Sequence, residues 1–496
     1  MSLEVIHYIM KNSIYKTIQN TIDRIEIDPE KYRHTFANPG KDFTRNRKQT
    51  LSSVVRTGLL RSGSTQNQDL RLVYGVGDDR PSASAYIQQR DKLTERFYRL
   101  LFDNMQEEKD LTLVKGHYLL AACDGSDISI CPNVDDESSL VSLSNNPHNK
   151  VCNQVHLNAL VAVPDGYFLD YEIQDHRDEN EIGACCAMVR RLSGRIGDNT
   201  SVIVTADRGY EGYFLMMDVA AQGQYFCIRL KDIDSGSISK RYRRLCDEKG
   251  CFDAVVTRKY TRRKDVYNNP ELFGDDFVYV GNSAKNYNHY VPKTNGTQGR
   301  KCCHLPVPYY EFSFRIVRFM IPGGCYEVLV TNLPSDEFSV EDLKEVYRLR
   351  WGVETSFRFL KYCDHVSLSN TRKKSAALGE IVLAMIFHNI CISVMIDASG
   401  IMKRRRRREK PSLFKVSYSD LSKTIRLFLA GRDPTITPRK IVKELSRTLQ
   451  TVRNGRVFSR ILNHHSFFLR PNRCDKKERA TNIRTIPMLM TPYVPL

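Results

Sequence analysis

The chain has 496 residues, 41% of them hydrophobic, which suits a folded protein of about three domains. Its 75 lysines and arginines exceed its 57 aspartates and glutamates, so the formal net charge is +18. A basic balance of this size favours a polyanionic partner, and nucleic acid is the commonest one. Attachment to a membrane surface is disfavoured, because no basic amphipathic helix with a strong apolar face is evident.

Cysteine usage and apolar stretches indicate where the protein works. The 14 cysteines form no C-x-x-C pair or zinc-module spacing, which is typical of reduced thiols in the cytoplasm. The N-terminus has no charged segment followed by an apolar one, so we expect no export signal. The most apolar stretch, Ile381–Ile396, contains His388 and Asn389 and suits a buried helix better than a membrane span. We therefore expect a cytoplasmic protein with no membrane contact.

The N-terminal region, up to about Phe102, has mostly helical spacing. A short basic segment, Asp42–Lys48, leads into a helical stretch at Leu51–Leu60. Pro81 opens a second predicted helix that reaches Arg90, since proline is accepted in a first turn. Small helices with interspersed cations suit a DNA-binding module, and a helical capping domain is an equal alternative.

Two apolar runs that each end at an aspartate follow. Tyr118–Cys123 precedes Asp124, and Ser201–Ala206 precedes Asp207. The elements around them are predicted strands His156–Val163 and Tyr167–Ile173, joined by a Pro164-Asp165-Gly166 turn, and helices Glu179–Ile196 and Gly212–Ala221. This order predicts an α/β fold with a mixed sheet and helices on its faces. Ligands and chemistry gather at strand ends in such sheets.

From about Gln224 to Asn332 the sequence pattern changes to that of short strands separated by basic loops, such as Lys285–Lys301. This pattern predicts a β-rich insertion. The predicted strands are Tyr225–Leu230, Ala254–Arg258, Phe277–Val280, Glu311–Arg318 and Tyr326–Val330. An apolar helix is then predicted at Leu378–Ala398, followed by an exposed linker at Lys403–Arg408 and a basic helical region from Tyr418. The arginines at 404–408 suit a phosphate-binding arm or a solvated charge run.

A single helix over Tyr347–Lys361 is predicted to carry two neighbouring faces. At about 100° per residue, Tyr347, Arg350, Glu354 and Lys361 fall on one narrow stripe. A separate apolar face is formed by Val346, Leu349, Val353, Phe357 and Leu360. Taken alone, this pattern is most often an ordinary surface helix. We expect Trp351, the only tryptophan, to pack in the core, with base stacking as the alternative.

Three acids in this basic chain form a candidate metal site: Asp124, Asp207 and Glu354. Mg²⁺ prefers a few carboxylates together with water and phosphate oxygens, and a pair of such ions activates a nucleophile and stabilises a leaving oxygen. Asp127 is an alternative to Asp124, and Glu211 is an alternative to Asp207. Each aspartate also suits an ordinary turn residue.

These residues carry a resemblance to the DDE transposases of bacterial insertion sequences. The chain resembles the large group with a Tyr-x2-Arg-x3-Glu-x6-Lys signature, insertion-sequence family four, from about Asp42 to Ser393. The signature is complete in Tyr347, Arg350, Glu354 and Lys361, with Asp124 in Cys-Asp-Gly-Ser and Asp207 in Ala-Asp-Arg-Gly-Tyr as the preceding acids.

The resemblance implies a ribonuclease-H-like catalytic domain interrupted by a β-strand insertion. It implies Mg²⁺, replaceable by Mn²⁺, as two ions held by Asp124, Asp207 and Glu354. It also implies that a homodimer joins the element's terminal inverted repeats to target DNA, in a bacterial cytoplasm at the nucleoid. Residues expected to contact DNA are Tyr347, Arg350, Lys361, Arg358 and Arg208. Relatives use an insertion tryptophan to hold a flipped base, and none occurs between Gln224 and Asn332.

We therefore predict a transposase that cuts element ends through a hairpin intermediate and transfers strands to a target. A metal-dependent site-specific nuclease and a catalytically silent DNA-binding protein are the alternatives. The predicted regions are 1–110 (helical, DNA-binding), 111–223 (catalytic core, first part), 224–334 (insertion), 335–400 (catalytic core, second part) and 401–496 (basic and helical, for DNA binding or dimerisation).

Overall fold

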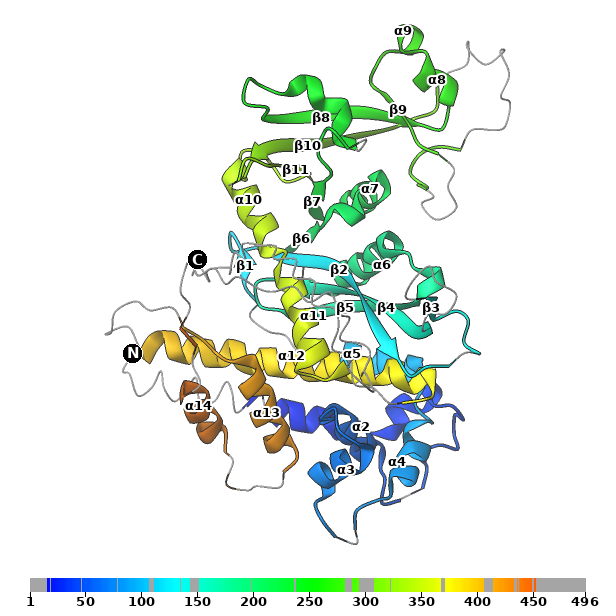
Figure 1. Cartoon of the computed structure of the whole chain (residues 1–496), viewed down its shortest axis with the longest axis vertical. Coiled ribbons are helices and arrows are strands. Elements are labelled where there is room, and N and C mark those ends of the chain that lie inside the picture. The colour runs from blue at the N-terminus through cyan, green and yellow to red at the C-terminus, as the bar shows by residue number, and fades with distance from the viewer. Residues whose placement is uncertain are drawn as a thin grey trace, which may run out of the picture.

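A large mixed β-sheet occupies the middle and upper part of the protein in Figure 1, above a layer of helices. The computed structural model describes residues 16–451 apart from 18, 46, 78, 107–110, 134, 143–150, 198, 236–237, 282–287, 294–306, 322, 367–370, 406–413, 432–434, 436 and 448–449. The predicted α/β class with a mixed sheet is confirmed.

Eleven of the described strands form this sheet, in the order β3-β4-β2-β6-β7-β11-β10-β8-β9, with β1 paired to β2 and β5 paired to β4. Neighbours β2 and β6, β6 and β7, and β8 and β9 run parallel. The strands are β1 (Leu113–Val114), β2 (Tyr118–Ile130), β3 (Leu140–Ser142), β4 (Val151–Ala162), β5 (Tyr167–Asp175), β6 (Ser201–Ala206), β7 (Tyr225–Leu230), β8 (Phe252–Thr261), β9 (Phe277–Tyr279), β10 (Tyr310–Met320) and β11 (Tyr326–Thr331).

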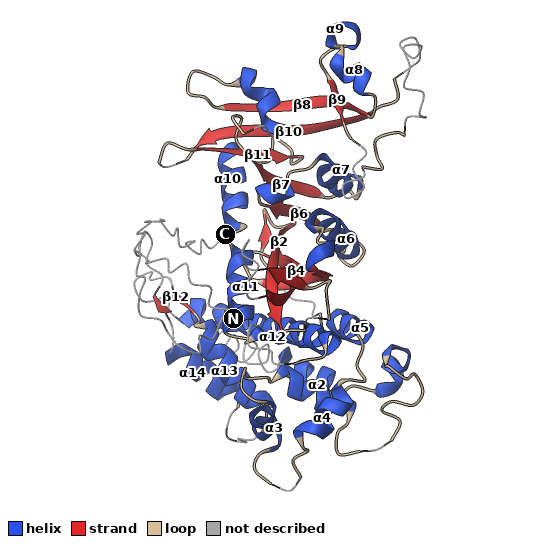
Figure 2. Cartoon of the chain, turned by 45° about the vertical axis from the view of Figure 1, so that its right-hand side comes forward, coloured by secondary structure: helices blue, strands red, loops and turns tan. Residues whose placement is uncertain are grey.

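Helices cover both faces of the middle of the sheet. Figure 2 shows α6 (Glu181–Ser193) and α7 (Tyr213–Ala221) on one side, and α10 (Val340–Leu349) and α11 (Gly352–Tyr362) on the other. Each buries an apolar face, because apolar residues recur at helical spacing. The predicted apolar face of the signature region is confirmed: Val346, Val353, Phe357 and Leu360 are buried, and Leu349 is partly buried against the core.

A helical layer lies beneath the sheet, centred on the long helix α12 (Lys374–Arg405). By length and composition α12 is apolar enough to cross a membrane, but 89% of its most apolar window is buried inside the protein. It packs against α2, α5, β5, α11 and α13, so the prediction of a buried helix is confirmed. The other helices of this layer are α2 (Leu51–Leu59), α3 (Gln66–Tyr74), α4 (Ala83–Arg90), α5 (Glu95–Met105), α13 (Tyr418–Leu429) and α14 (Pro438–Arg447).

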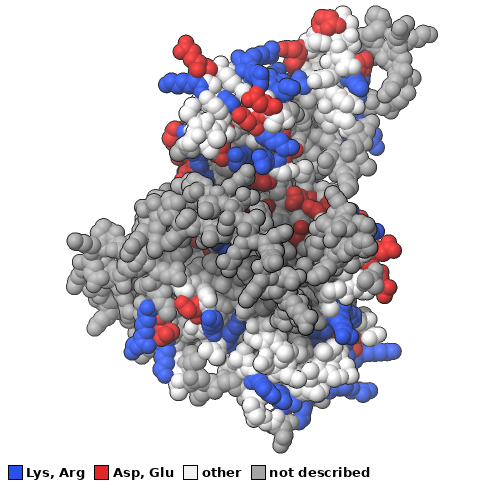
Figure 3. All heavy atoms as spheres, in the orientation of Figure 1, with Lys and Arg blue, Asp and Glu red and all other residues white. Residues whose placement is uncertain are grey.

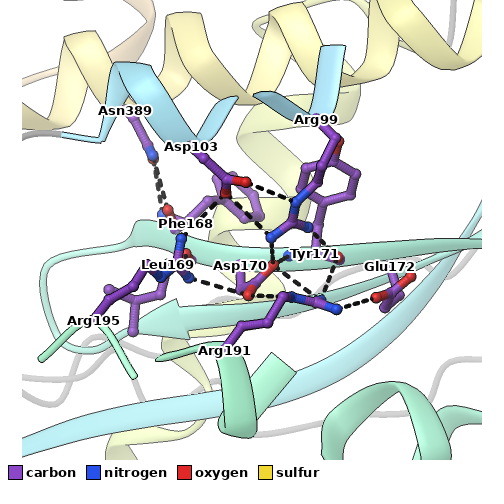
Figure 4. Close-up of polar contacts among 10 residues, drawn as sticks. All are labelled: Arg99, Asp103, Phe168, Leu169, Asp170, Tyr171, Glu172, Arg191, Arg195 and Asn389. Atoms are coloured by element: carbon purple, nitrogen blue, oxygen red, sulfur yellow. Dashed lines mark hydrogen bonds and ion pairs between the residues drawn. The ribbon is translucent and has the colours of Figure 1, made fainter. Parts of the chain in front are cut away.

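A buried ion network joins this layer to the sheet (Figure 4). The carboxylate of Asp170 on β5 is fully buried. It forms ion pairs with Arg99 of α5 at 2.6 Å, Arg191 of α6 at 2.9 Å and Arg195 at 3.1 Å. Asp103 accepts from Arg99 and Arg195, and Glu172 from Arg191, so three arginines meet three carboxylates. Beside it, the Asn389 side chain of α12 hydrogen-bonds both the N–H and the C=O of Phe168.

Several sequence-based predictions need correction. Pro81 precedes the helix it was expected to open, because Ser82 is the N-cap of α4 and accepts a hydrogen bond from Ala85 N–H. The predicted linker from Lys403 begins inside α12, which continues to Arg405. Short helices in the basic β-rich region were not predicted: η4 (Ile238–Leu245), α8 (Lys264–Asn268) and α9 (Pro270–Phe273).

Other predictions fall partly outside the described residues: the arginines at 406–408, most of the 285–301 loop and the chain after 451. The boundaries of the five predicted regions stay predictions.

Candidate active site

Strand register brings the two aspartates together. Strands β2 and β6 are parallel neighbours, and their last pair is Ala122 with Thr205. Asp124 and Asp207 each lie two residues further, so each points to the same face as the pair before it. Because paired strands run about 4.8 Å apart, the two carboxylates lie at adjacent places. Only Asp207 stands at a strand end, since β2 continues to Ile130 in its pairing with β4, so the predicted position of Asp124 was wrong.

Local backbone hydrogen bonds orient both carboxylates. Asp124 accepts from the N–H of Gly125 at 3.0 Å. Asp207 is the N-cap of the 3-10 turn η3 (Arg208–Tyr210) and accepts from the N–H of Gly209 at 2.7 Å. Asp and Asn favour such caps, because a short side-chain acceptor reaches the free amides of the first turn.

The third acid comes from α11, which packs on β2 and β4. The predicted single helix is interrupted: α10 ends at Leu349, and α11 begins at Gly352. The turn between them tightens through i→i+3 hydrogen bonds such as Val353 N–H to Arg350 C=O. Gly352 suits this place because a Cβ there would meet Val163 Cγ1 at 2.7 Å.

Arg350 links the acids that the sheet and the helix present. Its guanidinium lies 2.9 Å from Glu354 Oε1 and 3.9 Å from Asp124 Oδ2. The side chain of Arg350 is buried, whereas Asp124 and Glu354 keep 22% and 35% of their side-chain surface exposed. The three carboxylates therefore open to solvent beside a fixed cation.

Electrostatics in the site favour a cation. Burial raises the pKa of Asp124 to about 6; Arg350 and the Gly125 N–H oppose this rise, and the charges of Asp207 and Glu354 add to it. A divalent cation would relieve the repulsion among these carboxylates, and oxygen ligands are those that Mg²⁺ prefers. The donor set therefore fits a divalent metal.

A cavity of about 530 Å³ opens beside the second aspartate. It is lined by Asp207, Arg208, Gly209, Glu211, Lys231, Ser235 and Ile238. Arg208 is exposed on its wall, and Lys231 adds a second cation. This cavity adjoins a candidate ligand and carries charges that suit a phosphate group.

Comparisons with known proteins now bear on this geometry. The family described as "Transposase DDE domain" matches residues 115–390, more than half of the chain. The chain belongs to this DDE transposase family. All three acids and Arg350 lie within the matched residues.

Curated relatives are insertion-sequence transposases. The putative transposase InsL for insertion sequence element IS186A of Escherichia coli (strain K12) and the transposase for insertion sequence element IS421 of Escherichia coli are each 36% identical over 70 residues. The match covers 14% of this chain and 18% of each relative's length. Among solved structures, a piggyBac transposase synaptic complex with hairpin DNA is 9% identical, with TM-score 0.43 over 89% of this chain and 83% of that one.

The expected DNA contacts of this DDE transposase differ in exposure. Arg358 and Arg208 are exposed. Lys361 is half-buried. Burial lowers its pKa, and the charge of Asp127 partly offsets this by raising it. Tyr347 is buried, with Arg350 5.7 Å from its ring, and burial raises its pKa while Arg350 and Arg229 lower it. Trp351 was expected in the core, but it is 45% exposed, so the packing prediction was wrong.

Both alternative acids have other partners. Asp127 accepts from His156 Nδ1 at 2.8 Å, and this hydrogen bond, more than any other cause, lowers the pKa of Asp127. Glu211 accepts the backbone N–H of Lys231 at 3.0 Å and that of Ile238 at 2.7 Å, which fixes the wall of the cavity. These contacts favour Asp124 and Asp207 as the site acids.

Sequence reasoning missed a histidine cluster directly behind the site. His156 on β4 pairs across the strands with Asp127, and its Nε2 donates to Glu181 of α6 at 3.2 Å. Burial opposes protonation of His156, but the hydrogen bonds to Asp127 and Glu181 overcome it and raise its pKa to about 9. Ligand atoms of His156, Glu179 and Glu181 lie within 4.8 Å of one another. Because its hydrogen bonds tie β2, β4 and α6 together, we interpret this cluster as an ionic support for the site.

Proposed function

We propose that this protein is a metal-dependent DNA transposase with Asp124, Asp207 and Glu354 as its metal ligands. The observation that carries the proposal is the convergence of these acids: adjacent parallel strands supply two, and Arg350 of the α10–α11 turn contacts both Asp124 and Glu354. The complete four-residue signature supports the further proposal that it is a member of insertion-sequence family four with a ribonuclease-H-like catalytic core.

The site would hold two Mg²⁺ ions, with Mn²⁺ as a substitute. When bound, such ions activate the attacking oxygen and stabilise the leaving one during in-line phosphoryl transfer. Side chains of the protein would hold the DNA. Arg350 and Lys361 hold phosphates of the strand being cut, Tyr347 buttresses Arg350, and Arg208 and Arg358 hold the flanking backbone.

The proposed reaction is a series of in-line attacks on phosphorus. Water attacks the phosphorus at the element end, the P–O3′ bond breaks, and the proton of water passes to solvent as the 3′-hydroxyl forms. That hydroxyl then attacks the phosphorus of the opposite strand, whose P–O3′ bond breaks and releases a 3′-hydroxyl on the flanking DNA, so that the element end closes as a hairpin. A second water attacks the hairpin phosphorus and breaks its P–O3′ bond, which frees the 3′-hydroxyl of the element. This 3′-hydroxyl finally attacks a phosphorus of target DNA, whose P–O3′ bond breaks and leaves a target 3′-hydroxyl. We propose a homodimer that holds two terminal inverted repeats, in a bacterial cytoplasm and on the nucleoid.

The test uses labelled DNA that carries the inverted repeats flanking the gene. Wild-type protein with Mg²⁺ is expected to yield nicked, hairpin and joined products. Glu354→Ala is expected to bind the same DNA and yield none. Glu341→Ala is the matched control, because Glu341 is an exposed acid in the first turn of α10. Cleavage retained by alanine variants of all three acids would overturn the proposal, and nicks without joined products would favour the nuclease.

A further inference from the structure

A second cavity is lined almost wholly by arginine side chains and is separate from the three acids. It measures about 440 Å³ and is formed by Arg241, Arg243 and Arg244 of η4, Arg258 of β8 and Asp275 before β9. Figure 3 shows lysines and arginines, interspersed with acids, over the upper part of the molecule, where β8 and β9 lie. Four guanidinium groups around one hollow need an anionic counterpart.

Carboxylates neutralise only half of this charge. Arg243 pairs with Asp234, and Arg244 pairs with Asp275 at 2.9 Å. Within the described part of the chain, Arg241 and Arg258 form no ion pair with a carboxylate. Arg241 has only a 3.5 Å hydrogen bond to the C=O of Phe277. Asp275 also feels the charge of Arg258, so among the described residues one cavity carboxylate faces four arginines.

Arg258 carries an unsatisfied donor beside the cavity. Its Nε is buried and has no hydrogen-bond partner among the described residues. Leaving a buried donor unpaired costs about 1–3 kcal/mol, and more for a charged group. Aromatic rings fix the two free cations in place: Arg258 lies 5.5 Å from the ring of Tyr242 and Arg241 5.3 Å from that of Tyr267. An acceptor with several oxygens would satisfy these donors.

Helix η4 contributes residues to both the arginine cavity and the cavity beside Asp207. Ile238, the first residue of η4, lines the cavity beside Asp207, and its N–H is held by Glu211. Arg241 follows three residues later, a rise of about 6 Å at about 2 Å per residue of 3-10 helix. Phosphates along one strand of duplex DNA are spaced by about 3.4 Å per nucleotide. The two cavities therefore suit phosphates a few nucleotides apart.

We propose that the arginine cavity binds backbone phosphates of the DNA end while the acids act on it. This inference rests on the proposed function. The planar guanidinium offers two parallel donors that match phosphate oxygens, and the contact is independent of base sequence.

The test measures the salt dependence of DNA binding by the double variant Arg241→Ala/Arg258→Ala. Each phosphate contact contributes about 0.9 to the slope of log K against log salt, so the slope should fall by about 2 between about 50 and 200 mM salt. Affinity for end DNA and for unrelated duplex should fall alike. The matched control is Lys240→Ala/Lys249→Ala, which removes two exposed charges that do not line the cavity, and its slope should stay unchanged.

Further arms separate the possible outcomes. Arg258→Lys keeps the positive charge but loses the two parallel donors of the guanidinium. Its slope of log K against log salt should match that of the wild type, whereas its affinity for DNA should be lower. If the double variant unfolds, Arg241→Gln alone should lower the slope by about 1. Wild-type cleavage with an unchanged slope in the variants overturns this inference alone, whereas absence of DNA binding by wild type overturns the proposed function. If inorganic phosphate binds the cavity but leaves the affinity for DNA unaltered, the inference about the arginine cavity is also overturned.

Discussion

His156 lies directly against Gly125, the residue that follows the first acid. A Cβ built on Gly125 would stand 2.2 Å from His156 Nε2 and 2.5 Å from Glu181 Oε1. The strand that carries Asp124 therefore rests on the hydrogen bond between His156 and Glu181. Glu181 also lies near Gly209, whose N–H donates to the second acid, because a Cβ on Gly209 would lie 3.8 Å from Glu181 Oε2.

Gly125→Ala should therefore disable the site without removing any acid. The methyl group must displace Asp124 or the histidine cluster, and a misplacement near 1 Å costs about 10²-fold in rate. Cleavage of end DNA should fall by about that factor while DNA binding persists. Gly197→Ala is the control, since a Cβ there meets nothing within 4 Å. Full cleavage by the Gly125 variant would contradict this account of the site.

The charge on His156 should appear as a pH-dependent stability. Its pKa of about 9 in the folded protein exceeds the ordinary value of 6.5, so folding favours the protonated form. The resulting stabilisation, up to about 3 kcal/mol, is complete below pH 6.5 and is lost as the pH rises through about 9.

Urea unfolding of wild type and His156→Gln at pH 6.5 and pH 9.5 measures this effect. The difference in unfolding free energy between the two proteins should shrink at the higher pH, because the imidazole has lost its charge. His117→Gln is the control, as His117 is about half exposed. An equal gap at both pH values would show that His156 contributes packing alone.

Local pattern predicted much of this arrangement, since it depends on residues near one another in the chain. The apolar run before Asp207 is β6, and the turn at Pro164-Asp165-Gly166 joins β4 to β5. The four-residue stripe also placed Arg350 one turn from Glu354, and they form an ion pair at 2.9 Å. Helical periodicity survives the interruption at Trp351 because the intervening turn keeps a right-handed helical backbone.

Long-range pairing explains what the sequence concealed. The contact of His156 with Asp127 depends on the register of β2 with β4, 29 residues apart, and that with Glu181 on how α6 packs. The need for glycine at position 352 depends on the closeness of Val163, which no nearby residue signals. Trp351 was misplaced for the same reason: composition favours burial of tryptophan, whereas the turn between α10 and α11 projects it outward.

Asp170 should be a main anchor between the helical layer and the catalytic sheet. Asp170→Asn keeps the shape of the side chain but leaves three arginines facing two carboxylates, so unfolding free energy should fall by about 3–5 kcal/mol. Asp178→Asn, an exposed acid beside the same strand, should change it by less than about 0.5 kcal/mol. Chemical denaturation measures both, and hydrogen exchange should show α5 losing protection before β2. A variant as stable as wild type would mean that solvent reaches the arginines and replaces the lost charge.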